Sequence, residues 1–486
     1  MRNRTLLIAL WRPLAVRMLL KSQVFQELRK QTWLRIIILT PHSKEERIRS
    51  AYAGSNVILE ELDRNALSGA QRGSKLRIIF RTVRLFTYRL ARVRMVMRDL
   101  MMHEYRQRHI TSHLSIFARL YFELILFLPR LLGHSRWLRA MWVGLEKLFF
   151  ARDTHRSVFE KYSPDWMLVS SLGYGYDDQL MWEARRHKTK LISVVQSWDN
   201  PSTKGYPADI PDSVIVWSSV MKSEVQKLLD IPANRIFVGG IPHWDIYFKS
   251  RKSREEEALF FNELGLDPQK RVIFFPTSAA KMYSDNVLIV RRVVEAITAD
   301  QINMPVQLLV RPHPGYYERS KKSKMPAIER DLEAIHDLAN KYPNIVKLDL
   351  MGVETYPDYY DIDVEEQSRL LRRLRYSSVL LNTYSTQAIE AALLDLPIVN
   401  TAFGRYKNTD QPNSVLDDSQ HFGRLIRTGG IYNAVSAEDM IIGINRYLED
   451  RTLDSVGRRR IVESEIPDNR GEAGVSVATH ILKVIR

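Results

Sequence analysis

An acid and a base occur together in one short segment that follows a predicted buried strand. The apolar run "KLISVV" ends there, and residues 198–204 then read "WDNPSTK". A carboxylate in a cleft can take the proton of an attacking hydroxyl group, particularly where burial raises its pKa. We therefore predict that Asp199 acts as a general base and that Lys204 neutralises a substrate phosphate. The structural alternative is that Asp199 and Asn200 shape an Asx turn before the proline.

A second pair of candidate catalytic residues lies at the end of the first half of the chain. The segment "GIPHWD" covers residues 240–245 and places His243 and Asp245 after another apolar run. Imidazole and carboxylate groups are common general acids and bases in enzymes. Both residues are therefore candidate catalytic groups.

The second half of the chain also carries polar residues directly after apolar runs. "LLVRPHPG" places Arg311 and His313 there, and both side chains suit phosphate oxygens. In "LLNTYSTQAIEAALL" Ser385 or Thr386 is placed to cap a helix, and the N–H groups at a helix start also bind phosphate. Ordinary capping is the alternative. Glu390, one helical turn after Thr386, could reach the ribose of a nucleotide bound there, although by itself it indicates a solvent-facing residue.

Three further features of the sequence are weaker evidence of a functional site. "SLGYGYDD" (171–178) has two glycines after a predicted strand, which serve either a turn or the close approach of a substrate. The acid-rich segment 356–367 is expected to be a loop. No spacing of His, Asp and Glu predicts a metal site.

The elements that position these residues are short apolar runs alternating with helical patterns. Runs without polar alternation are typical of parallel strands covered on both faces. The strands expected are 4–10, 34–41, 56–62, 165–172, 190–197, 213–219, 235–240, 271–278, 306–314, 344–349, 377–385 and 396–403. They predict an α/β chain of two Rossmann-like domains facing across a cleft. We expect a first domain over 1–249, a linker over 250–270, a second domain over 271–470 and a terminal helix over 471–486.

Composition narrows the class of protein. A chain of 486 residues exceeds one ordinary domain. It has no cysteine, which excludes a disulfide framework, a thiolate metal site and a cysteine nucleophile. The first residues, "MRNRTLLIALWRP", hint at a signal peptide, but the apolar core is short and Trp11 and Arg12 follow it. We expect a first strand there, and a cytoplasmic protein with no transmembrane segment.

Residues 71–150 hold 16 Lys and Arg against 4 Asp and Glu. This segment therefore carries +12 of the whole chain's net charge of +16. Apolar residues at helical spacing predict a helix over 76–101, with Arg77, Arg81 and Arg84 off the apolar stripe. Such a basic helical insertion is either packed on its own domain or held against an anionic membrane. The segment "WLRAMWVGLEKLFF" (137–150) favours the membrane. No nucleic-acid-binding module occurs there.

Four motifs and one departure carry a family resemblance. The motifs are "RPHP" at 311–314, "YST" at 384–386, "GIPHWD" at 240–245 and a strand ending in Pro276–Thr277. Together they resemble the GT-B glycosyltransferases and, within that group, the CDP-glycerol glycerophosphotransferases and related surface-polysaccharide transferases. The family has Trp-His-Gly-Thr-Pro-Leu-Lys where this chain has residues 198–204. Asp199 therefore stands where the family has its proposed catalytic histidine.

The resemblance implies a nucleotide-donor site in the second domain and an acceptor domain before it. Its donor-binding residues would be Thr277, Ser278, Arg311, His313, Tyr384, Ser385, Thr386 and Glu390. A carboxylate in place of the histidine favours a sugar donor over CDP-glycerol. We expect a metal-independent glycosyltransferase without a cofactor, which extends a surface glycan or lipid-linked acceptor at the inner membrane face. The alternatives are a CDP-glycerol-type polyol-phosphate transferase, a sugar-nucleotide epimerase and an inactive nucleotide-binding protein on the membrane.

Overall fold

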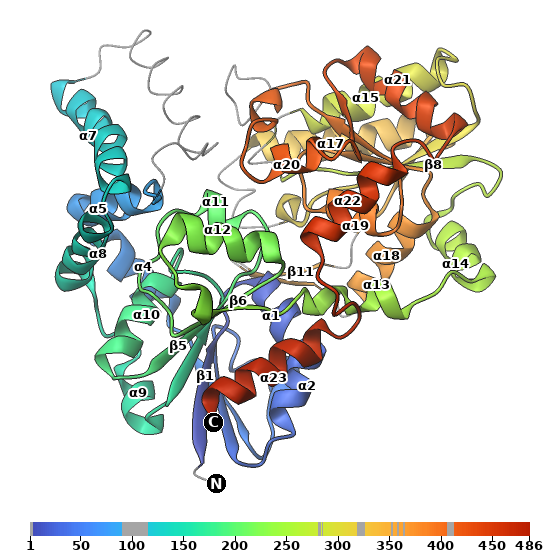
Figure 1. The fold of residues 1–486 in the computed structure, drawn as a ribbon. Helices are drawn as coiled ribbons and strands as arrows, with labels where there is room; N and C mark the ends of the chain where they lie inside the picture. The colour runs from blue at the N-terminus through green and yellow to red at the C-terminus, as the bar shows by residue number, and fades with distance from the viewer. Residues whose placement is uncertain are drawn as a thin grey trace. The chain divides into compact units, whose positions relative to one another are not determined.

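The computed structural model describes residues 3–89, 115–279, 283, 285–317, 326–350, 353–356, 359–362, 365–405 and 413–486. The chain divides into two compact units, each with its own sheet (Figure 1). The first unit contains Met1–Asp245 and Glu465–Arg486, and the second contains Ile246–Ser464. Among the residues described, no helix combines the length and the apolar character needed to cross a membrane.

The first unit is built on a seven-stranded parallel sheet in the order β3-β2-β1-β4-β5-β6-β7. Its strands are β1 (Arg4–Ala9), β2 (Leu34–Thr40), β3 (Val57–Glu61), β4 (Trp166–Val169), β5 (Lys190–Val194), β6 (Ser213–Val216) and β7 (Ile236–Val238). Strand order reverses between β1 and β4. Such a switch point opens a crevice at the carboxyl ends of the strands.

The second unit is built on a six-stranded parallel sheet in the order β10-β9-β8-β13-β14-β15. Its strands are β8 (Arg271–Pro276), β9 (Val306–Arg311), β10 (Val346–Leu348), β13 (Val379–Asn382), β14 (Ile398–Thr401) and β15 (Tyr432–Ala434). Here the order reverses between β8 and β13. A separate antiparallel hairpin joins β11 (Val353–Tyr356) to β12 (Tyr359–Ile362).

The helices and short 3-10 turns connect these strands and cover the sheets. In the first unit the helices are α1 (Pro13–Leu19), α2 (Gln23–Arg29), α3 (Glu46–Tyr52), α4 (Arg64–Arg72), α5 (Lys75–Leu85), α7 (Ile116–Gly133), α8 (Arg136–Phe150), α9 (Arg156–Tyr162), α10 (Asp177–Arg186), α11 (Asn200–Thr203), α12 (Ser219–Leu229) and α23 (Ala473–Ile485), with 3-10 turns η1 (Ala233–Arg235) and η2 (Pro242–Trp244). Helices α13 (Asp245–Lys249) and α22 (Ser455–Glu465) cross the boundaries between the units. The second unit has α14 (Arg254–Leu264), α15 (Asn286–Thr298), α17 (Pro326–Lys341), α18 (Glu366–Tyr376), α19 (Gln387–Leu393), α20 (Phe422–Ile426) and α21 (Ala437–Glu449), with η3 (Pro314–Tyr316) and η4 (Asn413–Leu416).

All twelve predicted strands are present, most of them shorter at one end than the apolar runs. The prediction omits β15, whose three residues are too few for a recognisable run, and it is wrong about the acid-rich segment, where β11 and β12 pair. The segment expected as a linker contains α14, which belongs to the second unit.

The core explains why the continuous apolar runs become strands. Leu7, Ile37, Met167 and Leu191 lie in one row across β2, β1, β4 and β5, and all are fully buried. Helix α10 covers this row with Leu180, Met181 and Ala184. In the second unit the corresponding row is Val346, Leu308, Ile273 and Val379. Each fully buried aliphatic side chain contributes about 1.5–3 kcal/mol relative to exposure.

Helix α5 corrects the predicted basic helix. It ends at Leu85. Of the predicted stripe residues within α5, only Val83 is fully buried. Leu76 of that stripe is 53% exposed, whereas Arg77 and Arg84, predicted to face outward, are 1% exposed. The burial of these two arginines has a specific cause in their partners.

A buried charge network holds α5 on the first unit. Arg84 donates to Glu146 at 2.7 Å and to Asp178 at 3.2 Å, and Arg77 donates to Asp178 at 2.9 Å and to Glu146. Both acids are fully buried. Because an unpaired buried charge is expensive, the acids and the arginines require each other. Residues 90–101 of the predicted helix lie outside the described residues.

The glycines of segment 171–178 serve close packing of the chain on itself. Gly173 and Gly175 have φ of +92° and +65°. A side chain at Gly173 would collide with Ala208, and one at Gly175 would collide with Trp11. The packing of the chain against Ala208 and Trp11 therefore requires glycine at both positions.

The terminal helix α23 returns to the first unit, where it lies beside α2 and η2 (Figure 1). Asp245 accepts the N–H groups of Ala473 and Gly474 at 2.9 Å each. Gly240, at φ +86°, leaves no room for a side chain against Ala473. Gly240 and Asp245 of the "GIPHWD" motif thus contact the first residues of α23.

Candidate active site

In the second unit, the ends of β8 and β9 are joined by hydrogen bonds. The hydroxyl of Thr277 accepts the N–H of His313 at 2.9 Å, and the N–H of Thr277 donates to the carbonyl of Arg311 at 2.9 Å. The hydroxyl of Ser278 donates to the carbonyl of Thr383 at 3.1 Å, which ties β8 to the end of β13. These predicted site residues therefore share one edge of the sheet, at its switch point.

The imidazole of His313 has a defined tautomer. Its Nδ1 accepts the N–H of Gly315 at 3.0 Å. A neutral ring that accepts at Nδ1 carries its hydrogen on Nε2. His313 is half-buried and is a hydrogen-bond donor at Nε2.

A sharp turn connects β13 to α19. Tyr384 adopts φ of +49°, which is uncommon for a residue with a side chain. Its N–H donates to Asn400 at 3.1 Å, and its hydroxyl bonds Asp417. Burial, reinforced by that bond, raises the pKa of Tyr384. Ser385, which precedes the N-cap residue Thr386, accepts the N–H of Gln387 at 3.3 Å, as the capping alternative predicts.

Glu390 is buried, not solvent-facing as a lone helical glutamate would be. It accepts a hydrogen bond from the hydroxyl of Tyr247 at 2.6 Å, and that hydroxyl accepts one from Gln367 at 3.2 Å. Thr386 precedes α19 and makes no side-chain capping bond. The structure thus gives Glu390 a packing role in the second unit, and a contact to ribose stays a prediction.

Arg311 is part of a buried ion network. Its guanidinium donates to Asp349 at 2.9 Å and pairs with Glu366. Asp349 also accepts from Arg373 at 3.2 Å. Burial lowers the pKa of Arg311, and the charge of Asp349 opposes this. The guanidinium therefore fastens β9 to α18, a role that the "RPHP" pattern does not indicate.

In the first unit, Asp199 follows β5 and immediately precedes α11. One carboxylate oxygen accepts the hydroxyl of Thr203 at 2.8 Å, and the other accepts the hydroxyl of Ser197. Its side chain caps no backbone N–H group of α11. The two hydroxyl donors therefore hold the carboxylate in one orientation.

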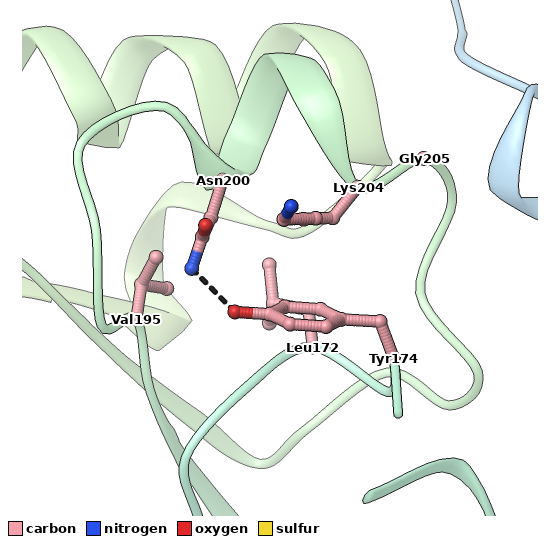
Figure 2. A pocket seen from close by; sticks show the side chains of 6 residues that line it. All are labelled: Leu172, Tyr174, Val195, Asn200, Lys204 and Gly205. Atoms are coloured by element: carbon pink, nitrogen blue, oxygen red, sulfur yellow. Dashed lines mark hydrogen bonds between the residues drawn. The ribbon is translucent and has the colours of Figure 1, made fainter. Parts of the chain in front are cut away.

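Lys204 lines a small pocket with Tyr174 and Asn200 (Figure 2). The pocket is partly open to solvent, and its cavity volume of about 10 Å³ is close to what one water molecule needs. The amide of Asn200 donates to the hydroxyl of Tyr174 at 2.6 Å. The ammonium of Lys204 lies 5.6 Å from the centre of the Tyr174 ring. Burial raises the pKa of Tyr174, so this phenol stays neutral.

His243 and Asp245, the second predicted catalytic pair, have different structural roles. His243 packs its ring against Trp217 and Trp244. Burial, and then the charge of Arg17, hold the pKa of His243 well below its ordinary value, which makes it a weak base. Asp245 accepts the first two N–H groups of α23, as described above. The two residues therefore do not act as a paired acid and base.

One group in the described part of the chain has ligand atoms close enough for a metal ion. Asp153, Glu183 and His187 place these atoms within 4.8 Å of one another. Glu183 accepts the N–H of His155 at 2.6 Å, and Asp153 pairs with Arg186 at 3.3 Å. The ring of His187 stacks on Phe159. These contacts hold α9 against α10 and account for the closeness of the three side chains.

Sequence reasoning missed three kinds of residue near the candidate site. Asp349 ends a predicted strand, and that position was a usable signal. Tyr174 lies in the glycine segment, where the glycines drew attention instead. Glu366 lies within the acid-rich segment, at the start of α18, and its pairing with Arg311 crosses 55 positions, so no local pattern indicates it.

Comparisons with known proteins agree with this arrangement. The sequence model of one family, described as CDP-Glycerol:Poly(glycerophosphate) glycerophosphotransferase, matches residues 171–342. Among solved structures, a glycosyltransferase from Rickettsia africae is similar, with 10% identity, TM-score 0.50 and coverage of 99% of this chain and 100% of that one. A UDP-GlcNAc 2-epimerase from Neisseria meningitidis bound to UDP-GlcNAc is similar with 10% identity, TM-score 0.51 and coverage of 99% and 100%. No curated protein sequence matches the chain.

These likenesses confirm the resemblance drawn from the motifs. The chain has the α/β fold of the GT-B group, with two Rossmann-like units. Residues 171–342 are similar to the CDP-glycerol glycerophosphotransferases. The match begins in the glycine segment of the first unit and ends within the second, so it includes both Asp199 and His313.

Proposed function

We propose that the protein is a transferase that moves a group from a nucleotide-activated donor to a surface glycan or lipid-linked acceptor. The observation that carries this proposal is the gathering of Thr277, Ser278, His313 and Ser385 at the switch point of the second sheet. Nucleotides bind at such switch points in open α/β sheets. The family match supports transfer as the reaction class.

The donor pyrophosphate would be held by hydrogen-bond donors of the second unit. The Nε2–H of His313 and the hydroxyl group of Thr277 are suited to this task. They would stabilise the negative charge that develops on the leaving group. We propose that the transfer needs no metal ion, because these donors take the place of a cation.

Asp199 would remove the proton of the attacking hydroxyl group as the new bond forms. Its hydroxyl partners, Ser197 and Thr203, hold the carboxylate in one orientation. A carboxylate base is common where a sugar is transferred, so a nucleotide-activated sugar is the donor we favour. Transfer of a polyol phosphate is the second candidate, and the family match supports it.

Nucleotide binding is the first test of this proposal. A thermal-shift panel of UDP, CDP, GDP and CMP should identify one base that raises the melting temperature of the wild type. A ligand at about a hundred times its Kd stabilises by roughly 2.7 kcal/mol. His313→Ala should reduce this shift, whereas His336→Ala, on the half-buried side of α17, should leave it unchanged. Absence of any shift in the wild type would contradict the proposal.

Arg311→Ala is not a suitable probe of the donor site. It would leave Asp349 and Glu366 buried without their cation. Breaking a buried pair in this way costs about 3–5 kcal/mol. A loss of nucleotide affinity in that variant would therefore report unfolding as readily as a lost contact.

Product analysis separates transfer from epimerisation. A sugar-nucleotide epimerase converts its donor into an isomer without an acceptor, whereas a transferase needs one. Incubation of the UDP- or CDP-linked donor, with and without a glycan acceptor, should yield a new product only with the acceptor. Asp199→Asn should abolish that product while nucleotide binding persists. Isomer formed from the donor alone would overturn the transferase proposal.

We further propose that α7 and α8 place the protein on an anionic membrane. Large apolar side chains recur at helical spacing along α7 and stay exposed: Ile116, Phe117, Leu120, Leu124, Phe127 and Leu131. Trp137 on α8 is 83% exposed. Helices α5, α7 and α8 lie beside one another (Figure 1). An amphipathic face of this kind, in a segment with excess positive charge, suits an interface of lipid and water.

Vesicle sedimentation tests the membrane proposal. Vesicles containing anionic lipid should recruit the full chain, and Phe117→Asp with Phe127→Asp should weaken recruitment. Ile442→Asp, at an exposed apolar position of α21 in the second unit, is the matched control. Arg77 and Arg84 are unsuitable targets because both are buried. Equal recruitment of all variants would contradict the role of α7.

A further inference from the structure

Asparagine side chains form a hydrogen-bonded row across the neighbouring strands β13, β14 and β15 of the second sheet. Asn382 lies in register with Asn400, and Asn400 lies in register with Asn433. The amide of Asn382 donates to the oxygen of Asn400 at 3.2 Å, and the amide of Asn400 donates to the oxygen of Asn433 at 2.7 Å. Asn382 and Asn400 are fully buried, so each depends on its neighbours for hydrogen bonds. We call these three side chains the amide ladder.

The amide ladder has a direction, which Asp417 sets. The amide of Asn433 donates to one carboxylate oxygen of Asp417 at 2.8 Å, and the hydroxyl of Tyr384 donates to the other. A carboxylate only accepts hydrogen bonds, whereas an asparagine can turn either its oxygen or its nitrogen toward a neighbour. Because Asp417 requires a donor from Asn433, every amide oxygen of the ladder points away from this carboxylate.

The other end of the ladder reaches the turn that precedes α19. Asn382 accepts the hydroxyl of Ser385 at 2.6 Å, and Asn400 accepts the N–H of Tyr384 at 3.1 Å. Tyr384 has φ of +49°, a conformation that persists only where the surrounding structure enforces it. The ladder supplies such contacts to the backbone of the turn, and Asp417 supplies one to the tyrosine hydroxyl.

The hydrogen bonds of Ser385 decide what its hydroxyl can offer to a ligand. Its only hydroxyl hydrogen is given to Asn382, and one lone pair accepts the N–H of Gln387 at 3.3 Å. The capacity that remains is a second lone pair. Ser385 is half-buried after β13, beside the switch point of the sheet. A phosphate oxygen also accepts hydrogen bonds and does not match this lone pair, whereas a hydroxyl or N–H group of a ligand does.

We propose that the amide ladder and Asp417 are positioning residues of the donor site, and that they make Ser385 an acceptor for a hydroxyl or N–H group of the nucleotide. This inference rests on the proposed function and deepens it. The pyrophosphate is left to His313 and Thr277, and Ser385 recognises the ribose or the base. Asp417 acts on this contact through the three asparagines, without touching the nucleotide itself.

Calorimetric titration of the full chain tests the inference. The probes are UDP, CDP and GDP, their 2′-deoxy and 3′-deoxy forms, and inorganic pyrophosphate. Ser385→Ala, Asp417→Asn and Asn433→Leu should each weaken nucleotide binding by about fivefold or more, the value of one hydrogen bond, and leave pyrophosphate binding unchanged. Ser385→Thr keeps the hydroxyl and should retain most of the affinity. Asn445→Leu is the matched control, because Asn445 bonds two backbone groups of the second unit outside the ladder.

The deoxy forms separate the two sources of the ligand's hydrogen. An effect of Ser385→Ala that disappears with one deoxy form assigns the contact to that ribose hydroxyl, and an effect that persists with both assigns it to the base. Equal weakening of nucleotide and pyrophosphate binding in Ser385→Ala would overturn the inference, because Ser385 would then hold phosphate. Unchanged nucleotide affinity in that variant would overturn it as well.

Unfolding without nucleotide separates this inference from the proposed function. If the ladder couples Ser385 to Asn433, the double variant Ser385→Ala with Asn433→Leu should lose less melting temperature than the two single variants lose in sum. Additive losses would overturn the action of the ladder on Ser385. If the wild type binds no nucleotide, the proposed function fails and the ligand assigned to Ser385 fails with it, while non-additive losses still support the ladder as the element that holds this turn.

Discussion

At the scale of single residues, burial decides what each charged group can do. Asp177 is fully buried at the start of α10. Burial raises its pKa from 3.8 to about 6, while its bonds to Ser171 and Trp11 and the charge of Arg12 act in the opposite direction, and Asp178 adds to the rise. The carboxyl thus keeps its proton in the folded chain at a pH where the unfolded chain has lost it.

This shift predicts a pH dependence of stability. Between about pH 4 and pH 6 the folded state binds more protons at Asp177 than the unfolded state, so the free energy of unfolding decreases as the pH rises. At about 1.4 kcal/mol per pKa unit, the loss is on the order of 2–3 kcal/mol and is complete above the folded pKa. Asp177→Asn should lack this loss. Urea unfolding of both proteins across this range measures it, and parallel curves would contradict the assignment.

Asp245 provides a residue-scale test of capping against catalysis. Asp245→Ala removes the acceptor of two N–H groups of α23 and should cost about 0.5–2 kcal/mol of stability. Asp245→Asn retains one acceptor and should keep most of the stability and the turnover. A general base would lose turnover equally in both variants. Unfolding and turnover measured side by side distinguish the two roles.

At the scale of elements, helices α5 and α8 are fixed by charge rather than by an apolar stripe. Glu146 of α8 pairs with Arg77 and Arg84 of α5 in a region closed to water. Such pairs do not by themselves make a fold more stable than an apolar contact would. They do make the position of α5 sensitive to the loss of any one partner.

Glu146→Ala should therefore destabilise the first unit by about 3–5 kcal/mol, because two buried arginines lose a partner. Glu160→Ala removes one end of an exposed pair with Arg156 on α9 and should cost no more than about 0.5 kcal/mol. Denaturant unfolding of the two variants measures both values. A small effect of Glu146→Ala would mean that α5 is held by other contacts.

At the scale of the whole molecule, the first unit is completed by the end of the chain. Helix α23 buries Val477, Ile481 and Ile485 within it. The second unit is a continuous segment, Ile246–Ser464, and carries the proposed donor site. Stability of the first unit and nucleotide binding by the second are therefore expected to respond separately to changes in α23.

Val477→Asp should lower the melting temperature of the first unit, since burial of an unpaired charge is costly. Val475→Asp, on the exposed side of α23, should have little effect. Calorimetry with the nucleotide found in the panel should still show stabilisation of the second unit in both variants. Loss of nucleotide stabilisation in Val477→Asp alone would contradict the independence of the two units.

The sequence by itself determined most of the strands and the points at which polar residues follow them. Each of the twelve predicted strands is a local run of apolar residues, and a strand buried on both faces needs no more than that run. For the same reason the sequence places Thr277, His313 and Ser385 where strands end, because strand ends follow from strand positions. Family motifs added the relation to the GT-B transferases.

Only the tertiary structure decided which charged residues are exposed and which are paired. Arg77 meets Glu146 across 69 positions, and Asp245 meets Ala473 across 228. Hydropathy places an arginine at the surface, because burial of a lone charge is costly. Its partner cancels that cost, and the partner is brought near only by the packing of distant segments. The same packing joins Asn433 to Ser385 through Asn400 and Asn382, which no spacing in the sequence indicates.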